Sequence, residues 1–381
     1  MKPPFRGKIR NEYTTASLVP DLDLSVEVSD IPPKHYKTQS SPLHSKTTPE
    51  QTTSSIAIMV SWNNIFTLAL GLIGSARAYT NPLRNPGGGD PQITYTGGYY
   101  YLISTEWDNL QLARATTIEG LKTATPKVIY TDNSPNRSGN FWAPELHYLG
   151  GRWYIYYTAG SKGTNLDNQR GHVIRGGASP WDSYTYGAQL HDDWGIDGTI
   201  LRTNEFGNYY VYSCMTGVPN QSTCVRKLGS NFMTTGALSI ISQPDQSWER
   251  SGVPVQEGAH ALYFNGKTYL TYSANYCWTP DYCVATLEWD GRTDPARAAA
   301  WKKSNGCKLK SANGNYGTGH NSFFVSPDGR TTYIVYHATS ESGGACDDRR
   351  YVMAQPVTAN SDGSPNFGTA RPFSQQFPEP R

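Results

Sequence analysis

The sequence predicts an all-β protein, a five-bladed β-propeller that spans residues 79–381. It is rich in aromatic residues, with 26 Tyr, 10 Trp and 11 Phe, it contains 37 Gly, and only 17% of its residues are charged. No amphipathic helix of useful length occurs in it. Five similar hairpin patterns start about 50 to 65 residues apart, and a repeat of this size is typical of propeller blades. The aromatic content also suggests a surface suited to carbohydrate.

Each hairpin pattern joins two short strands, rich in Tyr, Val, Ile and Thr, through a tight polar turn. A β-sandwich with long loops is the rival fold, but it does not explain five matched hairpins. The expected strand pairs are Gln92–Tyr95 with Tyr99–Ser104, Glu145–Leu149 with Arg152–Ala159, Thr199–Thr203 with Tyr209–Cys214, Ala259–Phe264 with Lys267–Ala274, and Ser322–Ser326 with Arg330–Ala338.

The first 78 residues differ in composition from the rest of the chain. Residues 1–58 are rich in Pro, Ser, Thr and Lys and nearly lack aromatics, so we expect a disordered extension. Residues 59–78 have the form of a secretory signal, with a short apolar run and an Ala-x-Ala site, although no Lys or Arg precedes the run. We therefore expect translation to start at Met59, with residues 1–58 a gene-model artefact, and the mature chain to begin near Tyr79. A type II membrane anchor or an apolar loop is the alternative.

The charge and the cysteines are consistent with a secreted protein. The net charge of +2 argues against a nucleic-acid-binding or polybasic membrane surface. No Cys or His spacing indicates zinc, and sequons at Asn136 and Asn220 matter only in a secreted chain. All six cysteines follow the signal-like segment, and six allow 15 pairings. Short loops favour the pairs Cys214–Cys224 and Cys277–Cys283, which leaves Cys307–Cys346.

Three acids each precede the first strand of a different hairpin, and each is followed at once by Pro or Gly. They are Asp90, Asp197 and Glu257. Because the innermost strands of a propeller line one channel, we expect these carboxyls to converge at its mouth. Glycoside hydrolysis needs two carboxyls, a general acid and a base or nucleophile, and a third can raise the pKa of the acid. The alternative is three unrelated turn residues.

The chain resembles glycoside hydrolase family 43 over nearly all of residues 79–381. Many family motifs occur in order, and together they are specific. They are Asn81-Pro82-Leu83, Gly89-Asp90-Pro91, Phe141-Trp142-Ala143-Pro144-Glu145, Gly151–Tyr157, Ile196-Asp197-Gly198-Thr199, Trp248-Glu249, Gln256-Glu257-Gly258, Tyr272-Ser273-Ala274, Gly319–Phe323 and Tyr336-His337-Ala338.

The resemblance implies an inverting glycosidase. By this resemblance Asp90 is the general base and Glu257 is the general acid. Asp197 tunes the pKa of Glu257 and orients it. The carboxyls of Asp90 and Glu257 should then lie roughly 6.5–9.5 Å apart. No cofactor is required, although in some relatives the histidine equivalent to His320 lies beside Ca²⁺ or another ion held through water. A histidine without metal is the alternative, and no acidic loop has the spacing of Ca²⁺ ligands.

The resemblance also suggests residues that contact the sugar. Trp142 and Glu145 are candidates for the pocket wall, with a core role and an acceptor role as their alternatives. Phe141 and Trp107 are candidates for stacking on a sugar ring, with an exposed loop aromatic as the alternative. His320 is a candidate at the channel. Arg349, or else Arg350, is a candidate for a substrate hydroxyl, with a surface role as the alternative.

The substrate class follows from the resemblance, namely plant polysaccharides that contain arabinose or xylose. We expect a secreted, monomeric, exo-acting α-L-arabinofuranosidase on arabinan, with no nucleic acid or membrane as partner. A β-xylosidase or an endo-1,5-α-L-arabinanase is the runner-up. A propeller lectin that binds sugar without cutting it is the alternative outside the enzymes. Retaining fructan-cleaving enzymes fit poorly, because the chain lacks their Arg-Asp-Pro motif.

Overall fold

The computed structural model describes residues 77–163 and 165–381, and strands run from β1 (Ala78–Thr80) to β23 (Gln376–Pro378). The predictions for residues 1–76 lie outside this part of the chain. Within it, helical structure is limited to three short 3₁₀ segments, at Glu119–Thr123, Ser247–Glu249 and Ala298–Ala300. In the described residues we find no helix with the length and apolarity that spanning a membrane would require.

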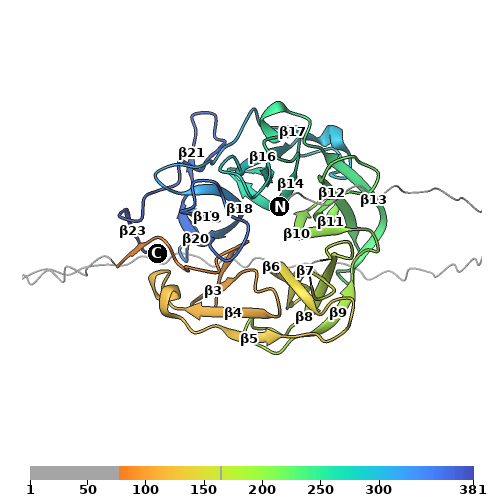
Figure 1. Ribbon diagram of the computed structural model, residues 1–381, viewed down its shortest axis with the longest axis horizontal. Coiled ribbons are helices and arrows are strands. Elements are labelled where there is room, and N and C mark those ends of the chain that lie inside the picture. The colour runs from red at the N-terminus through yellow and green to blue at the C-terminus, as the bar shows by residue number, and fades with distance from the viewer. Residues whose placement is uncertain (1–76, 164) are drawn as a thin grey trace, which may run out of the picture. The chain divides into compact units, whose positions relative to one another are not determined.

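The five-bladed β-propeller is confirmed. Five antiparallel sheets follow one another along the chain and surround a common axis (Figure 1). The first four sheets have four strands, and the fifth has three. The blades are β2–β5 (Gln92–Thr96, Tyr99–Ile103, Leu110–Ala115, Lys127–Tyr130), β6–β9 (Gly139–Leu149, Arg152–Gly160, Arg170–Arg175, Thr185–Gln189), β10–β13 (Gly195–Thr203, Gly207–Cys214, Ser222–Leu228, Thr234–Ser242), β14–β17 (Gln256–Phe264, Lys267–Ala274, Cys283–Trp289, Trp301–Lys303) and β18–β20 (Tyr316–Val325, Thr332–Thr339, Tyr351–Pro356).

The five hairpins expected from the sequence are the first two strands of the five blades. The innermost strand of each blade contacts the innermost strand of the next, and β18 contacts β2, so the ring is closed. Four of the innermost strands begin three to six residues earlier than the sequence pattern indicated, because a β-bulge interrupts the alternation near their start.

The N-terminal part of the described chain closes the ring against the last blade. The amide of Leu83 donates to the carbonyl of Val352 in β20 at 2.8 Å, and the Val352 amide donates to the Arg84 carbonyl at 2.9 Å. Just before this segment, β1 pairs with β23, and the Tyr79 ring stacks on Phe377. Chain segments from both ends of the described region therefore meet beside the fifth blade. The hairpin of β21 (Thr358–Ala359) and β22 (Pro365–Asn366) lies nearby in sequence.

The hydrophobic core is divided into five clusters, each lying between two neighbouring blades. Eleven of the twelve largest fully buried side chains are tyrosines. The high aromatic content therefore reflects packing between blades more than a carbohydrate-binding surface. A tyrosine fits this position because its ring fills the interface. The hydroxyl reaches a polar partner in most of them, but those of Tyr157, Tyr210 and Tyr269 have none among the described residues.

The disulfide prediction is partly wrong. Cys214–Cys224 forms as expected, but the other bridges are Cys277–Cys346 and Cys283–Cys307. Cys283 begins β16, and the neighbouring Val284 pairs with Leu309, which brings Cys307 alongside. Cys277 lies in the preceding loop, which extends toward the fifth blade. Closeness in sequence predicted the wrong partner because Cys283 lies in a strand beside Cys307, whereas Cys277 lies in a loop beside Cys346.

We predict that Leu83→Ala weakens the closure of the ring. Leu83 is fully buried in the cluster that joins the first and fifth blades, and truncation of such a side chain costs about 2–5 kcal/mol. The free energy of unfolding in urea measures the effect. Val128→Ala, at a side chain 52% exposed, is the control and should change stability by less than about 0.5 kcal/mol. Equal losses in the two variants would contradict the role of Leu83.

Candidate active site

One backbone feature recurs at the entrance of every innermost strand. A residue there has a positive φ, and this backbone conformation directs the residue and its chain neighbours toward one end of the ring. Its N–H then donates to a side chain of the preceding blade, or in one case to the carboxylate at the same position there. The five bonds are Asp90 (φ +55°) to His337 Nδ1, Ala143 (+44°) to Thr105 Oγ1, Asp197 (+60°) to Thr158 Oγ1, Gly258 (+57°) to Asp197 Oδ2 and His320 (+44°) to Ser273 Oγ.

This repeat brings the three predicted acids to the same end of the propeller. Asp90 and Asp197 occupy the positive-φ position, and Glu257 directly precedes it. Only glycine fits at position 258. Its φ is positive, and a Cβ there would lie 2.9 Å from the His320 ring. The sequence prediction that these carboxyls converge agrees with this geometry.

The Asp90 carboxylate is held by two cations and a hydroxyl. Arg350 Nη1 donates to Oδ1 at 2.7 Å, Thr105 Oγ1 donates to Oδ2 at 2.6 Å, and His320 Nδ1 lies 3.1 Å from Oδ1. Burial alone would raise the pKa of Asp90, but Arg350 and His320 hold it well below its ordinary value. Asp90 is therefore ionised across the neutral range.

Glu257 is partly buried and faces neutral hydrogen-bond donors. The Tyr282 hydroxyl donates to Oε1 at 2.9 Å, and Gln221 Nε2 donates to Oε2 at 2.8 Å. Burial raises the pKa of Glu257 above its ordinary value, although His320, Tyr282 and Gln221 counteract it. The two acids thus have opposite pKa shifts, as expected for a base and an acid in one site.

Asp197 lies between the surroundings of Asp90 and those of Glu257. Its carboxylate accepts the N–H of Gly258, the residue after Glu257, at 3.2 Å, and its Oδ2 lies 3.8 Å from His320 Nδ1. Burial raises the pKa of Asp197, against the effect of His320 and together with the neighbouring carboxyls of Glu257 and Asp90, to about 7.

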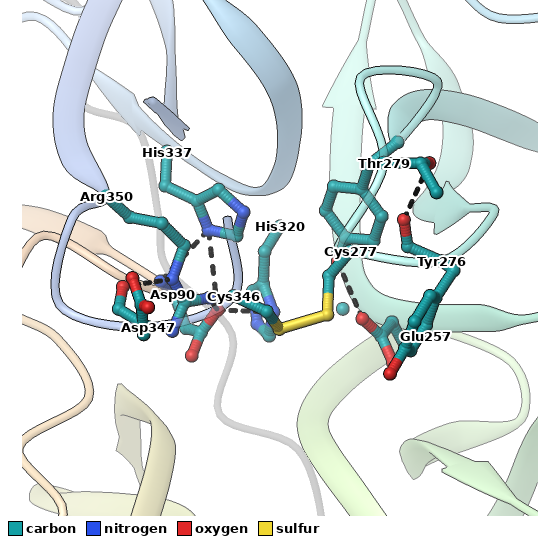
Figure 2. Close-up of a disulfide and its surroundings, with 12 residues drawn as sticks. Asp90, Glu257, Tyr276, Cys277, Thr279, His320, His337, Cys346, Asp347 and Arg350 are labelled. Atoms are coloured by element: carbon teal, nitrogen blue, oxygen red, sulfur yellow. Dashed lines mark hydrogen bonds and ion pairs between the residues drawn. A yellow bond between two sulfur atoms is a disulfide. The ribbon is translucent and has the colours of Figure 1, made fainter. Parts of the chain in front are cut away.

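His320 is the cation at the centre of this group. Burial would lower its pKa, but Asp90 and Asp197 raise it to about 9. Figure 2 shows His320 between Asp90 on one side and Glu257 on the other, with His337 and Arg350 beside Asp90. The sequence resemblance correctly indicated a histidine at this channel position.

A match to a family model covers residues 79–365, and its description is "Glycosyl hydrolases family 43". The chain belongs to this family. The segment matched includes every residue of the site described above.

Relatives of known name match across most of the propeller. The "Extracellular exo-alpha-(1->5)-L-arabinofuranosidase" of Streptomyces avermitilis is 36% identical over 306 residues, which cover 76% of this chain and 63% of the relative. The "Alpha-L-arabinofuranosidase 43" of Humicola insolens is 35% identical, covering 74% of this chain and 62% of the relative. The match thus spans less than two thirds of the length of these two curated relatives.

A solved structure shares the family fold over nearly its whole length. The crystal structure of α-L-arabinofuranosidase from Lactobacillus brevis superposes with a TM-score of 0.72 at 30% identity, covering 78% of this chain and 98% of that one.

Other predicted site residues of this family 43 chain lie elsewhere. Phe141 was expected to stack on a sugar ring, but it is fully buried and its ring stacks on Tyr157 at 5.6 Å. That prediction is wrong, because the alternation of β6 turns Phe141 into the core between the first two blades. Trp142 and Trp107 remain partly exposed and meet edge to face at 5.8 Å, so both stay candidates for contact with a sugar.

Glu145 lies deeper, two residues past the positive-φ position of its strand. It accepts hydrogen bonds from Thr199 Oγ1 at 2.6 Å and faces His147 Nε2 and His260 Nδ1, each at 2.8 Å. Burial would raise the pKa of Glu145, but the two histidines lower it below its ordinary value. Of the two roles considered from the sequence, this position fits an acceptor within the channel rather than a pocket wall.

Arg349 was the wrong choice between two neighbouring arginines. Its side chain is about half exposed and pairs with Asp347 at 2.9 Å, whereas Arg350 is buried against Asp90. Four further residues that support the acids were not identified as site residues from the sequence, namely Thr105, Gln221, Tyr282 and His337. Only His337 stood in a quoted family motif, and the others had no local signal.

Three cavities in the described residues do not coincide with the acids, and the largest of them, of about 610 Å³, is lined by Trp248, Asp281 and Tyr316. One of about 540 Å³ is lined by Arg202, Glu205, Tyr263 and Trp289. Another, of about 270 Å³, is lined by His147 and His260. The chemistry of the three carboxyls therefore locates the site better than cavity size does.

The ion considered near His320 does not fit the described residues as a direct ligand set. Held between Asp90 and Asp197, His320 is an imidazolium at neutral pH and offers no lone pair to a metal. In residues 77–163 and 165–381, no group of three or more His, Cys, Asp or Glu has metal-binding geometry.

We predict that His320 stays protonated at pH 7.5. Its folded pKa of about 9 exceeds the ordinary 6.5, so the stability it contributes is complete below pH 6.5 and is lost as the pH rises through about 9. Imidazole ¹⁵N shifts in NMR follow its titration. His191 is the internal control, because burial lowers its pKa to about 4. A His320 that titrates at or below 6.5 would contradict the ion-paired cluster.

Proposed function

We propose that the protein is an inverting glycoside hydrolase, an exo-acting α-L-arabinofuranosidase that removes terminal arabinose from arabinan. One observation carries the proposal. Three carboxyls, of which Asp197 is buried and Asp90 and Glu257 are partly buried, meet at one end of the propeller. Their surroundings shift the pKa of Asp90 down and the pKa of Glu257 up. The family match and the names of the relatives support the substrate class.

Asp90 acts as the general base. Ionised in the resting enzyme, it takes a proton from the water that attacks the anomeric carbon, while Arg350 and Thr105 fix its orientation. Both contacts are side-chain donors to carboxylate oxygens, so they hold Asp90 in its reactive form. The remaining lone pairs are available for the water.

Glu257 acts as the general acid and protonates the leaving oxygen. Its raised pKa favours the protonated form, which donates this proton. After transfer, Tyr282 and Gln221 stabilise the new carboxylate through the hydrogen bonds that they already make. Asp197 orients the segment of Glu257 through the Gly258 N–H and keeps negative charge near the acid.

The stereochemical outcome depends on the gap between the two catalytic carboxyls. Inversion needs space for a water, which corresponds to roughly 6.5–9.5 Å between Asp90 and Glu257. That spacing remains a prediction. Asp90 comes from the entrance of the first blade and Glu257 from the fourth, so the two lie on different sides of His320.

We expect Trp107 and Trp142 to contact the sugar, and the enzyme to act as a monomer outside the cell. Three disulfides and no free cysteine in the described chain support an oxidising compartment. A β-xylosidase or an endo-1,5-α-L-arabinanase would keep the same mechanism with a different product.

We predict that the protein releases only arabinose from linear arabinan, with inversion at the anomeric carbon. Time-resolved NMR of the products identifies both the sugar and its first-formed anomer. Arabinoxylan and xylo-oligosaccharides are assayed in parallel. Xylose or arabino-oligosaccharides as products would move the substrate assignment, and a retained anomer would contradict the role of Asp90.

We predict that Glu257→Gln lowers kcat on arabino-oligosaccharides by about 10²–10⁴-fold while sugar binding persists. The loss should be smaller on p-nitrophenyl arabinofuranoside, because its leaving group needs little protonation. Glu288→Gln is the matched control, since Glu288 pairs with Lys267 at the surface. A lectin would bind sugar equally well before and after the Glu257 change and show no turnover in either form.

A further inference from the structure

The Cys277–Cys346 disulfide is the bridge that joins two blades. It links the loop of residues 275–282, which follows β15 in the fourth blade, with the loop of residues 340–350, which follows β19 in the fifth. Cys214–Cys224 and Cys283–Cys307 each lie within a single blade region. In the view of Figure 2, the bridge lies between Asp90 with its cations and Glu257.

The loop at the Cys346 end supports the base. The residue after Cys346, Asp347, offers its carbonyl to the Nε of Arg350 at 3.1 Å and to the Arg350 amide at 3.3 Å. The same guanidinium then donates to Asp90 at 2.7 Å. The position of the Asp90 carboxylate therefore depends on a short chain of contacts that starts beside the disulfide.

The loop at the Cys277 end supports the acid. It ends in Tyr282, whose hydroxyl donates to Glu257 and whose ring stacks on His337 at 5.6 Å. The side chain of Asn275 ties the two ends of the loop together, since its Nδ2 donates to the Asp281 carbonyl at 2.9 Å. Movement of this loop would therefore move the partner of the acid.

Apart from the disulfide, the two loops are joined only weakly. Among the described residues, no hydrogen bond or ion pair connects residues 275–282 with residues 340–350. The Arg349 guanidinium lies 5.8 Å above the Trp278 ring. Gly344 packs so closely on Thr279 that a Cβ would lie 2.6 Å from its backbone. Such packing resists approach of the loops but not their separation.

We propose that the Cys277–Cys346 bridge is a positioning element of the active site, which holds the loop that supports Glu257 at a fixed distance from the loop that supports Asp90. The inference rests on the proposed function of these two acids. A catalytic pair must be held within about 0.5 Å of its working geometry, and inversion requires a gap that admits one water. Opening the bridge therefore impairs the chemical step, reversibly.

The first test compares two double variants. Cys277→Ser with Cys346→Ser opens the bridge between blades, and Cys283→Ser with Cys307→Ser opens a bridge inside one blade region. With the first, kcat on an arabino-oligosaccharide should fall roughly 10- to 100-fold, and less on p-nitrophenyl arabinofuranoside, which depends little on the acid. The control variant should lower Tm without changing the ratio of kcat on the two substrates.

The second test uses the wild-type protein, so it does not depend on the folding of a variant. Cys346 is partly exposed, whereas Cys214 and Cys224 are fully buried, so mild reductant should open the bridge between blades before Cys214–Cys224. Mass spectrometry after alkylation identifies the opened bridge. Loss of kcat on the oligosaccharide should follow its opening, and reoxidation should restore it.

The inference is overturned when the first double variant and the reduced protein keep the wild-type kcat ratio and pH profile. It is also overturned when both double variants lose the same fraction of kcat in proportion to Tm. An inert wild-type protein would instead refute the proposed function. In that case crystal structures of the oxidised and reduced protein still decide. A change of more than about 0.5 Å in the distance between the Asp90 and Glu257 carboxyls supports the positioning role of the bridge, and an unchanged distance refutes it.

Discussion

The hydrogen bonds donated by the five positive-φ residues are the constraint on which both the ring and its site depend. Each N–H at the entrance of an innermost strand reaches the blade before it, so each bond crosses a boundary between blades. A residue other than glycine with a positive φ costs of order 1–3 kcal/mol, and only a well-packed surrounding structure maintains this conformation. The same geometry turns Asp90, Asp197 and His320 toward one end. Assembly of the ring and assembly of the site are thus one event.

The sequence predicted the features that are local. Alternating aromatic strands around tight turns identified the blades, and an acid before each of three first strands identified the candidate site. Features set by contacts between distant segments were not predictable in this way. The partner of Cys277 lies 69 residues away, and the choice between Arg349 and Arg350 depends on which side chain faces Asp90. Phe141 was misassigned because a bulge shifts the alternation of β6, and bulges leave no clear signal in one sequence.

Beneath the acids, a second layer keeps other charges from disturbing them. Two residues beyond each positive-φ position, the innermost strands carry polar side chains, and Glu145 and His260 belong to this layer. The Glu145 carboxylate is hydrogen-bonded to His260, His147 and the Thr199 hydroxyl. The pKa values of the three acids depend mainly on burial, on Arg350 and His320 and on one another, and Glu145 is not among the leading causes of their shifts.

A count of charges then explains why the site holds a proton for the leaving group. Arg350 and His320 bring two positive charges into a buried space that contains three carboxyls. Asp90, in contact with both cations, takes one negative charge, and a second is enough for neutrality. Ionising Asp197 and Glu257 together would leave an uncompensated buried charge, which is costly. These two carboxyls therefore share one proton near neutral pH as a coupled pair. Glu257, close to Tyr282 and Gln221 rather than to Arg350, is the member that can deliver this proton to the leaving oxygen and stabilise the charge that remains.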